Sequence, residues 1–264
     1  MYDFQYQRPA SVADAVKAIA SDGDAKLVAG GMTLIPTLKQ RLAKPTSLID
    51  LGKIAELRGI KRDGNAIVIG AMTKHVEVAN SAEVKGAIPA LADLASMIGD
   101  PAVRNRGTIG GSISNNDPAA DYPSALVALG ATVITNKRKI AADDFFKGMF
   151  ETALGGDEIV TAVSFPIPEK AAYMKFRNPA SRYAIVGTFV AKTGGNVRVG
   201  VTGAAPSVFR WKDAEAALGK SWAADALKNL TVKADGLNTD IHASSEYRAH
   251  LVGVMARRAV TKAG

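Results

Sequence analysis

The sequence contains no cysteine and only three histidines among its 264 residues. Without cysteine the chain cannot form a disulfide, use a thiol as a nucleophile, or bind zinc or an iron–sulfur cluster through thiolates. No two of the histidines, His75, His242 and His250, have the spacing of metal ligands on a helix. We therefore expect no metal site in this chain, and any redox chemistry would need an organic cofactor.

Long apolar runs are also missing. The longest, from Ala125 to Ile134, has about half the length that a bilayer span requires. No segment with the charged, apolar and small-residue order of a secretion signal opens the sequence. The balance of 47% hydrophobic and 22% charged residues is that of an ordinary globular protein. We expect a cytoplasmic protein with no membrane span.

Aromatic residues are few, at 6% of the chain, although lysine and arginine (33) outnumber aspartate and glutamate (25). The basic residues are scattered, and Lys137-Arg138-Lys139 is the only run of three. No basic stretch carries the interleaved aromatic residues that stack on nucleic-acid bases. The net charge of +8 therefore indicates an acidic ligand or a negatively charged protein partner rather than nucleic acid.

Helical and strand patterns are mixed along the whole chain, which predicts an α+β fold. Thr193 to Asn196 is a strong hairpin signal between two apolar runs, and a helix is expected from about residue 245 to 260. From Gly99 to Pro123 the periodicity disappears, so this segment is expected to be a long ordered loop. A domain boundary is most plausible between residues 169 and 178.

Two glycine pairs stand where an apolar run meets a helix or loop. The first, Gly30-Gly31, follows the apolar run that ends at Ala29 and precedes a helical pattern from Thr33. Glycine allows the backbone to pass close to a ligand, and free N–H groups at a helix start can hold an anion. A tight turn without a ligand is the simpler alternative.

The second pair, Gly110-Gly111, also offers backbone donors, and the carboxylates of Asp117 and Asp121 follow it. Asp121 is suited to accept a hydrogen bond from a ribose hydroxyl. The alternative is that both aspartates cap turns or the next helix, and for Asp117 we favour this interpretation. Neither glycine pair has the G-x-G-x-x-G fingerprint or a P-loop, so a Rossmann fold and a nucleotide triphosphatase are unsupported.

The two motifs together resemble a known family. The strings are Ala29-Gly30-Gly31-Met32-Thr33-Leu34-Ile35-Pro36, Arg104-Asn105-Arg106-Gly107-Thr108-Ile109-Gly110-Gly111-Ser112 and Asp117-Pro118-Ala119-Ala120-Asp121-Tyr122-Pro123. They resemble the FAD-binding medium subunit of molybdenum hydroxylases, the family of aerobic carbon monoxide dehydrogenase and xanthine dehydrogenase. Further matching segments at 157–160 and 181–187 extend the resemblance over nearly the whole chain.

The resemblance implies an FAD-binding domain of the vanillyl-alcohol oxidase type over residues 1–175, with subdomains of about 1–55 and 56–175. A smaller sheet-and-helix domain would follow over residues 176–264. The FAD pyrophosphate would lie against the two glycine loops. The implied cofactor-binding residues are Ala29, Gly30, Gly31, Met32, Thr33, Leu34, Ile98, Thr108, Ile109, Gly110, Gly111, Ser112, Asp121, Val160, Lys175 and Tyr183.

Three of these residues have more specific implied roles. Ile98 would lie beside the isoalloxazine, and Val160 would offer backbone groups to it. Tyr183 corresponds to an aromatic residue that covers one face of the ring and would act as a mobile lid. Lys175 matches a cofactor-binding position of the family only if a gap is placed in the alignment of this segment. A lysine exposed to solvent is an equally good interpretation.

The sequence departs from the family at Met32, where many relatives carry His or Gln, and Met32 cannot donate a hydrogen bond. Other polar residues have simpler interpretations. His75, on a predicted amphipathic helix, is expected to be a surface or capping residue. Arg104 and Arg106 would reach a phosphate or a partner subunit, or would be solvated loop residues. We expect no catalytic acid or base.

The resemblance implies an electron-transfer subunit with FAD as its own cofactor. A small subunit would carry two [2Fe–2S] clusters and a large one the molybdenum–pterin centre, as a heterohexamer formed by a dimer of heterotrimers. Electrons would leave through FAD to NAD⁺, a quinone or another acceptor. One alternative is a stand-alone flavoprotein oxidase, but the residues after the flavin domain are few for a substrate-binding cap. The other is a flavin-free scaffold subunit, against which the intact glycine pairs argue.

Overall fold

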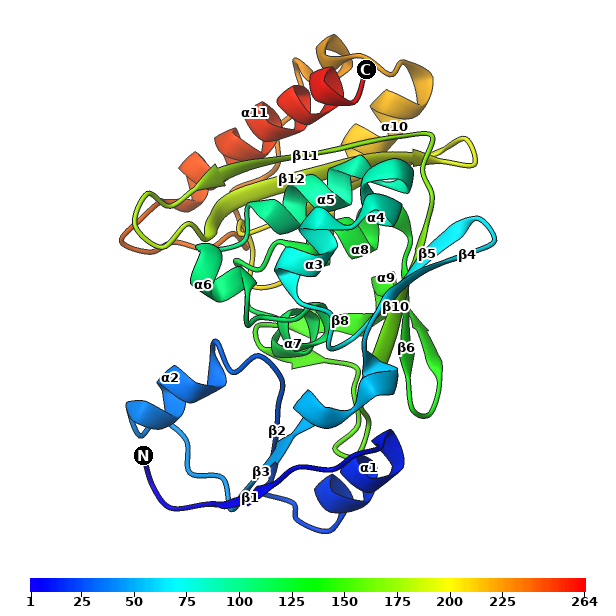
Figure 1. The fold of residues 1–264 in the computed structure, drawn as a ribbon. Helices are drawn as coiled ribbons and strands as arrows, with labels where there is room; N and C mark the ends of the chain where they lie inside the picture. The colour runs from blue at the N-terminus through cyan, green and yellow to red at the C-terminus, as the bar shows by residue number, and fades with distance from the viewer.

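The computed structural model describes all residues 1–264, and the chain forms three successive parts (Figure 1). The first part is a small parallel sheet with the strand order β1-β3-β2 and two helices beside it. Its strands are β1 (Gln5–Gln7), β2 (Lys26–Val28) and β3 (Ser47–Asp50), and its helices are α1 (Val12–Ala20) and α2 (Leu34–Lys39). Two short 3₁₀ turns, η1 (Leu51–Lys53) and η2 (Ala55–Leu57), lead into the second part.

The second part is an antiparallel sheet with the order β4-β5-β10-β6-β7 and a group of helices beside it. Its strands are β4 (Ile60–Asp63), β5 (Ala66–Gly70), β6 (Thr132–Thr135), β7 (Lys139–Ala141) and β10 (Val160–Pro166), with a separate hairpin of β8 (Phe146–Gly148) and β9 (Glu151–Thr152). The helices are α3 (His75–Asn80), α4 (Ala82–Ala87), α5 (Pro89–Ser96), α6 (Pro101–Arg104), α7 (Ile109–Asn115), α8 (Tyr122–Leu129) and α9 (Ala142–Phe145).

The third part is a four-stranded antiparallel sheet, covered on one face by its own helices and on the other by α5 and α8 of the second part (Figure 1). Its strands are β11 (Lys170–Arg177), β12 (Ala184–Thr193), β13 (Asn196–Thr202) and β14 (Phe209–Arg210), and its helical segments are α10 (Lys212–Lys220), η3 (Ala224–Leu227) and α11 (Ser245–Ala263). The boundary expected after residue 175 falls inside β11, because this strand pairs with β12 along its whole length.

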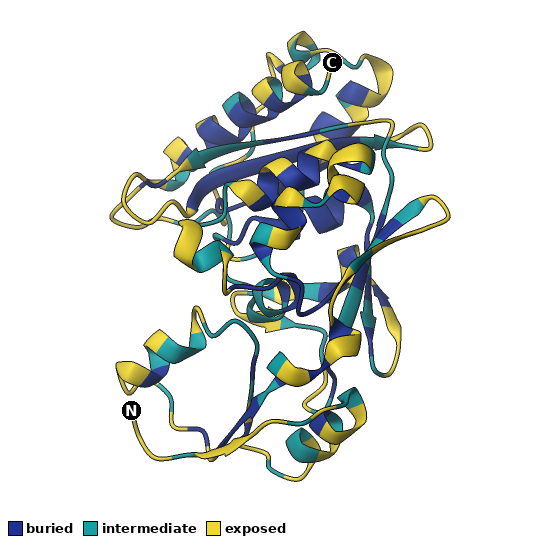
Figure 2. Ribbon diagram, viewed as in Figure 1, coloured by how far each residue is buried: buried dark blue, intermediate teal, exposed yellow.

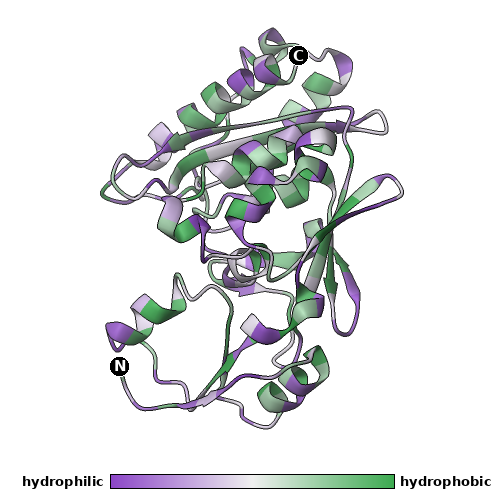
Figure 3. Ribbon diagram, viewed as in Figure 1, coloured by the Kyte–Doolittle hydropathy of each residue, from purple (hydrophilic) through white to green (hydrophobic).

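The apolar core is distributed unevenly over these parts. Clusters of 31 and 18 buried apolar residues fill the second and third parts, whereas the main cluster of the first part has only 8. Figure 2 shows this difference as buried colour concentrated around β12 and the helices beneath it, and Figure 3 shows hydrophobic and hydrophilic residues alternating along α11. The position of the first part therefore depends strongly on its contacts with the second.

The structure confirms the α+β class and the hairpin between β12 and β13, where Thr193 pairs with Asn196. The expected long loop from Gly99 to Pro123 is wrong, because α6 and α7 lie within it. Each is started by a side-chain cap, Asp100 for α6 and Thr108 for α7. The glycine and serine residues of α7 are weak helix formers, which hid its period. No helix combines the length and apolar character needed to cross a membrane.

A buried hydroxyl joins the third part to the segment that contains Asp121. Thr202, at the end of β13, donates its side-chain hydroxyl to the Ala120 carbonyl oxygen at 2.6 Å, and Pro118 O lies at 3.1 Å. The backbone N–H of Gly203 also donates to Pro118 O at 2.8 Å. The segment 117–121 is thereby fixed against the C-terminal sheet.

We predict that T202V lowers the free energy of unfolding by about 1–2 kcal/mol, because it leaves the buried carbonyl oxygen of Ala120 without a donor. Thr188 on the neighbouring strand β12 is the matched control, because its hydroxyl is fully buried and has no partner. T188V is expected to be neutral or stabilising. Urea unfolding of both variants measures the difference, and equal losses would contradict this role of Thr202.

Candidate functional site

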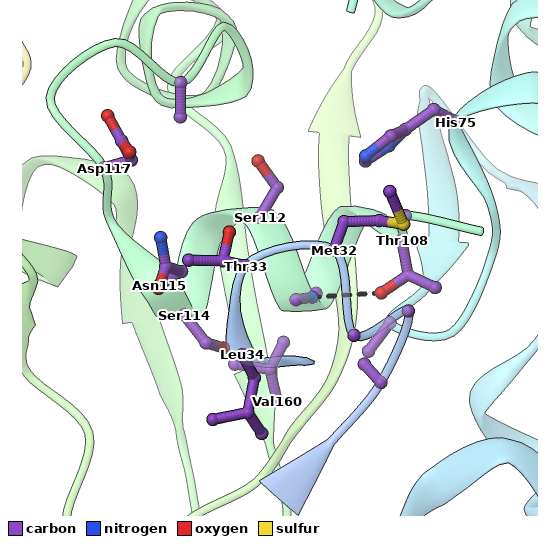
Figure 4. Close-up of a pocket in the computed structure, with 18 of the residues that line it drawn as sticks. Met32, Thr33, Leu34, His75, Thr108, Ser112, Ser114, Asn115, Asp117 and Val160 are labelled. Carbon is purple, nitrogen blue, oxygen red and sulfur yellow. Dashed lines mark hydrogen bonds between the residues drawn. The ribbon is translucent and has the colours of Figure 1, made fainter. Parts of the chain in front are cut away.

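A cavity of about 500 Å³ lies where the three parts meet. Its walls come from the end of β2 and the loop before α2, the segment 107–117, the start of β10 and residues 181–183. Figure 4 shows Thr33, Ser112, Asn115 and Asp117 around this space, with His75 on the opposite side. A cavity of this size, with apolar walls and a few polar groups, is typical of a site for a small organic ligand.

The two glycine loops touch each other backbone to backbone at one side of the cavity. A Cβ atom on Gly30 would lie 2.3 Å from the Arg106 carbonyl oxygen and 2.7 Å from the Gly107 Cα. No residue other than glycine fits at this position without moving one of the loops. Gly31 follows with φ of +72°, a left-handed conformation that glycine adopts without strain.

The first glycine loop has unpaired backbone donors. No hydrogen bond within the chain uses the N–H groups of residues 30–34, which follow one another into the start of α2. The simpler interpretation of this loop as a tight turn leaves these donors without a role. Consecutive N–H groups at such a turn form a concave, partly positive surface that binds phosphate or other anions.

The second glycine loop differs from the expectation that it also offers free donors. The N–H groups of Ile109 and Gly110 donate to Thr73 O and Ala71 O at 3.1 and 2.8 Å, and that of Gly111 donates to the Thr108 hydroxyl at 3.2 Å (Figure 4). Gly110 is required for packing, because its Cβ would lie 2.6 Å from the Ala71 Cβ. This loop is therefore a rigid wall fixed to the segment 71–75.

Asp121 is held by two side chains from β11. Its Oδ2 accepts a hydrogen bond from Lys175 Nζ at 2.9 Å, and its Oδ1 accepts one from the Tyr173 hydroxyl. Burial raises the pKa of Asp121, while the charge of Lys175 and the two hydrogen bonds lower it. Lys175 also donates to Met97 O, and its side chain is only 1% exposed. The alternative of a solvated Lys175 is therefore wrong.

Asp117 and Arg104 of the second motif serve the local backbone, whereas the exposed Arg106 side chain has no partner in the chain. Asp117 Oδ1 accepts from Ala119 N at 2.8 Å, which confirms the expected turn cap, and burial raises the pKa of this carboxyl. Arg104 Nη1 donates to the carbonyl oxygens of Ile98 and Gly99 at 2.9 and 3.0 Å and so fixes the turn after α5. This role was not expected from the sequence.

Of the sixteen residues that the resemblance implies, fourteen line the cavity. They are Ala29, Gly30, Gly31, Met32, Thr33, Leu34, Ile98, Thr108, Gly110, Gly111, Ser112, Asp121, Val160 and Tyr183. Ile109 lies in the core behind the wall, and Lys175 contacts the cavity only through Asp121. Phe150 was missed by the sequence reasoning. It joins Met32 and Tyr183 as an exposed large side chain at the rim, with exposed fractions of 57%, 39% and 49%.

His75 is the other residue that sequence reasoning placed wrongly. It lines the cavity with 4% exposure instead of lying on the surface, and Lys74 rather than His75 caps α3. Burial, with a smaller contribution from the charge of Arg104, lowers the pKa of His75 to about 4. Its Nδ1 atom is fully buried without a hydrogen-bond partner, and so is the hydroxyl of Tyr122, whose ring centroid lies 5.4 Å away.

We predict that His75 makes the fold less stable as the pH falls. The unfolded state takes up a proton near pH 6.5 and the folded state only near pH 4, so stability is lost between these values. The free energy of unfolding of the parent falls as the pH is lowered from 7 to 4.5. In H75Q this fall should be smaller by about 2 kcal/mol. Chemical unfolding at both pH values measures this, with H250Q at an exposed histidine as control. An identical pH dependence in H75Q and the parent would contradict the prediction.

We predict a large stability loss in K175M, because it leaves the buried carboxylate of Asp121 without its cation. Removing one partner of a buried pair costs about 3–5 kcal/mol. The exposed pair Lys262–Asp93, at 2.7 Å and with both side chains more than 40% exposed, provides the control K262M, expected to lose less than about 1 kcal/mol. Thermal or urea unfolding compares them, and similar losses would show that the Lys175 pair is not a structural link.

Two protein-family models match this chain. Residues 2–168 match the family model described as the FAD binding domain in molybdopterin dehydrogenase, and residues 171–263 match the CO dehydrogenase flavoprotein C-terminal domain. The first match covers more than half of the chain. The junction between the two matches lies at the start of β11.

Individual relatives cover nearly the whole chain. The medium subunit of nicotine 6-hydroxylase from Paenarthrobacter nicotinovorans is 35% identical over 98% of this chain and 97% of its own length. The carbon monoxide dehydrogenase medium chain of Hydrogenophaga pseudoflava is 35% identical over 98% and 96%. The structure of reconstituted CO dehydrogenase from Oligotropha carboxidovorans matches with a TM-score of 0.92 at 34% identity, covering 99% of this chain and 98% of that one. The chain is a member of the family of FAD-binding medium subunits of molybdenum-containing dehydrogenases.

Proposed function

We propose that this chain binds FAD in the cavity between its glycine loops and is the electron-transfer subunit of a molybdenum hydroxylase complex. The observation that carries the proposal is the series of five unpaired N–H groups at residues 30–34, which lie at the cavity wall. A dinucleotide such as FAD has a negatively charged diphosphate, which such donors bind. The family to which the chain belongs is named for this cofactor.

The remaining donors of the cavity also fit a dinucleotide. Hydroxyl and amide side chains line the cavity and can bond to sugar hydroxyls and phosphate oxygens: Thr33, Ser112, Ser114 and Asn115 (Figure 4). The walls also contain apolar groups such as Ile98 and Val160, which suit a flat aromatic ring.

When bound, FAD supplies the redox chemistry of this subunit. The chain's own residues bind and orient it. We propose that Ile98 and the backbone of Val160 face the isoalloxazine and that Tyr183, half-exposed at the rim, covers one face of the ring. Asp121 is held in one place by Lys175 and Tyr173, so it presents a fixed carboxylate to the cofactor.

The proposal of partner subunits is supported by the absence of cysteine and by relatives that are named as medium subunits. Since this chain cannot ligate an iron–sulfur cluster through thiolates, any such cluster would belong to another chain. We propose a small subunit with [2Fe–2S] clusters and a large subunit with the molybdenum–pterin centre, assembled as a dimer of heterotrimers. Electrons would pass from the clusters to this subunit and leave to NAD⁺ or a quinone.

The test is the absorption spectrum of the purified chain, with the cofactor identified after release by heat. Bound FAD near one per chain, without iron–sulfur absorption, is expected. The flavin-free scaffold requires a colourless chain that does not take up added FAD, alone or in its complex. The stand-alone oxidase requires a chain that purifies without partners and reduces its flavin with an organic substrate.

We predict that G111V weakens FAD binding at least about tenfold, because a side chain here projects toward the first glycine loop. A Cβ at this position would lie 3.0 Å from the Thr108 Oγ1 and 3.4 Å from the Ala29 Cβ. Gly86, in α4, has open space around it and provides the control G86V with the same change in helix propensity. Flavin fluorescence titration measures both, and unchanged FAD affinity in G111V would contradict the site.

A further inference from the structure

A buried histidine stands beside the second glycine loop because two chain segments pair there. The N–H of His75 donates to Gly107 O at 3.0 Å, and the N–H of Ile109 donates to Thr73 O at 3.1 Å, so Lys74 and Thr108 form an antiparallel bridge. This pairing places the first residue of α3 directly against the loop. The position of the imidazole is thus fixed by backbone hydrogen bonds on both sides.

The ring is built into the wall and has no partner in the chain. A Cβ atom on Gly107 would lie 2.6 Å from Nε2 and 2.9 Å from Cδ2, so this glycine makes room for the edge of the imidazole. Neither ring nitrogen has a hydrogen bond, and only Nδ1 is fully enclosed, which leaves Nε2 as the nitrogen with access to the cavity. Figure 4 shows the ring extending from α3 toward the side of Met32 and Thr108.

The environment favours a neutral ring. Nδ1 and the hydroxyl of Tyr122 are both buried without a partner, and the two ring centroids lie 5.4 Å apart. The burial and the nearby charge of Arg104 oppose protonation of both nitrogens. A neutral imidazole with its proton on Nε2, the nitrogen that has access to the cavity, is a hydrogen-bond donor to a ligand there.

Most backbone donors of this wall are already used. The N–H groups of Ile109, Gly110 and Gly111 are paired within the chain, so the remaining donors are the N–H of Thr108 and side-chain groups such as the Ser112 hydroxyl. The cationic side chains that line the cavity, Lys26 and Arg182, belong to other segments. An oxygen-rich ligand that touches both glycine loops therefore finds a series of backbone donors on the first loop only.

We propose that His75 is a positioning residue of the cofactor site. Its Nε2–H donates a hydrogen bond to the bound flavin nucleotide beside the second glycine loop. The inference rests on the proposed FAD site. In the free protein the unpaired imidazole destabilises the fold, since a buried polar group without a partner is unfavourable. The ligand supplies the missing partner, so the same ring favours binding.

The test compares H75L and H75Q with the parent chain by titration with FAD. Leucine removes the donor, and the dissociation constant for FAD should rise about tenfold. Glutamine retains an N–H group that corresponds to Nε2 and should recover most of the affinity. H250L, at an exposed histidine of α11, should bind like the parent. The cofactor-free H75L should melt no lower than the parent, which separates this role from a structural one.

A second measurement uses the parent chain itself. With only three histidines, ¹⁵N-labelled histidine gives a simple spectrum, and H75Q assigns the signal of His75. Addition of FAD should produce an imidazole N–H signal that is protected from exchange. Parent-like FAD affinity in H75L, or no change of the His75 signal on binding, would overturn the role of His75 while leaving FAD binding intact. A parent chain that binds FAD neither alone nor in its complex would overturn the proposed function and this inference together.

Discussion

The site depends on the direct contact between two backbones at Gly30 and Gly107. No side chain separates the loops there, and a Cβ atom on Gly30 would overlap the Arg106 carbonyl oxygen. The first part of the chain has a small core of its own, so this contact and the cavity wall that it forms are important for its position. A ligand that bridges the loops adds a second connection between the same two parts. Binding and the relative placement of the parts are therefore coupled.

The two glycine loops have different tasks in spite of their similar sequences. The first keeps its N–H groups unpaired and can bind an anion, whereas the second uses its N–H groups to attach itself to the segment 71–75. The second loop is also connected to the C-terminal sheet, because Asp121 at its far end is bonded by Tyr173 and Lys175 of β11. One loop thus supplies donors and the other supplies a rigid frame against which a ligand is oriented.

The sequence was sufficient for the family and for most local features, although not for α6 and α7, and it was insufficient for groups whose environment comes from distant segments. The glycine pairs, the β12–β13 hairpin and the capping role of Asp117 follow from neighbouring residues. Lys175 and His75 do not. Lys175 is buried by contacts to Asp121 and Met97, which are 54 and 78 residues away. His75 is enclosed by Gly107 and Tyr122, and no local pattern distinguishes such a histidine from one on the surface.

The carboxylates and the histidine that line the cavity are largely engaged within the chain or kept uncharged. A general acid or base needs a free titratable group near its working pH. Here Asp121 and Glu158 are occupied by Lys175, Tyr173 and Arg138, and burial keeps the imidazole of His75 uncharged at neutral pH. Asp117 caps a turn. The rim, in contrast, carries exposed aromatic side chains, which suit contact with another molecule.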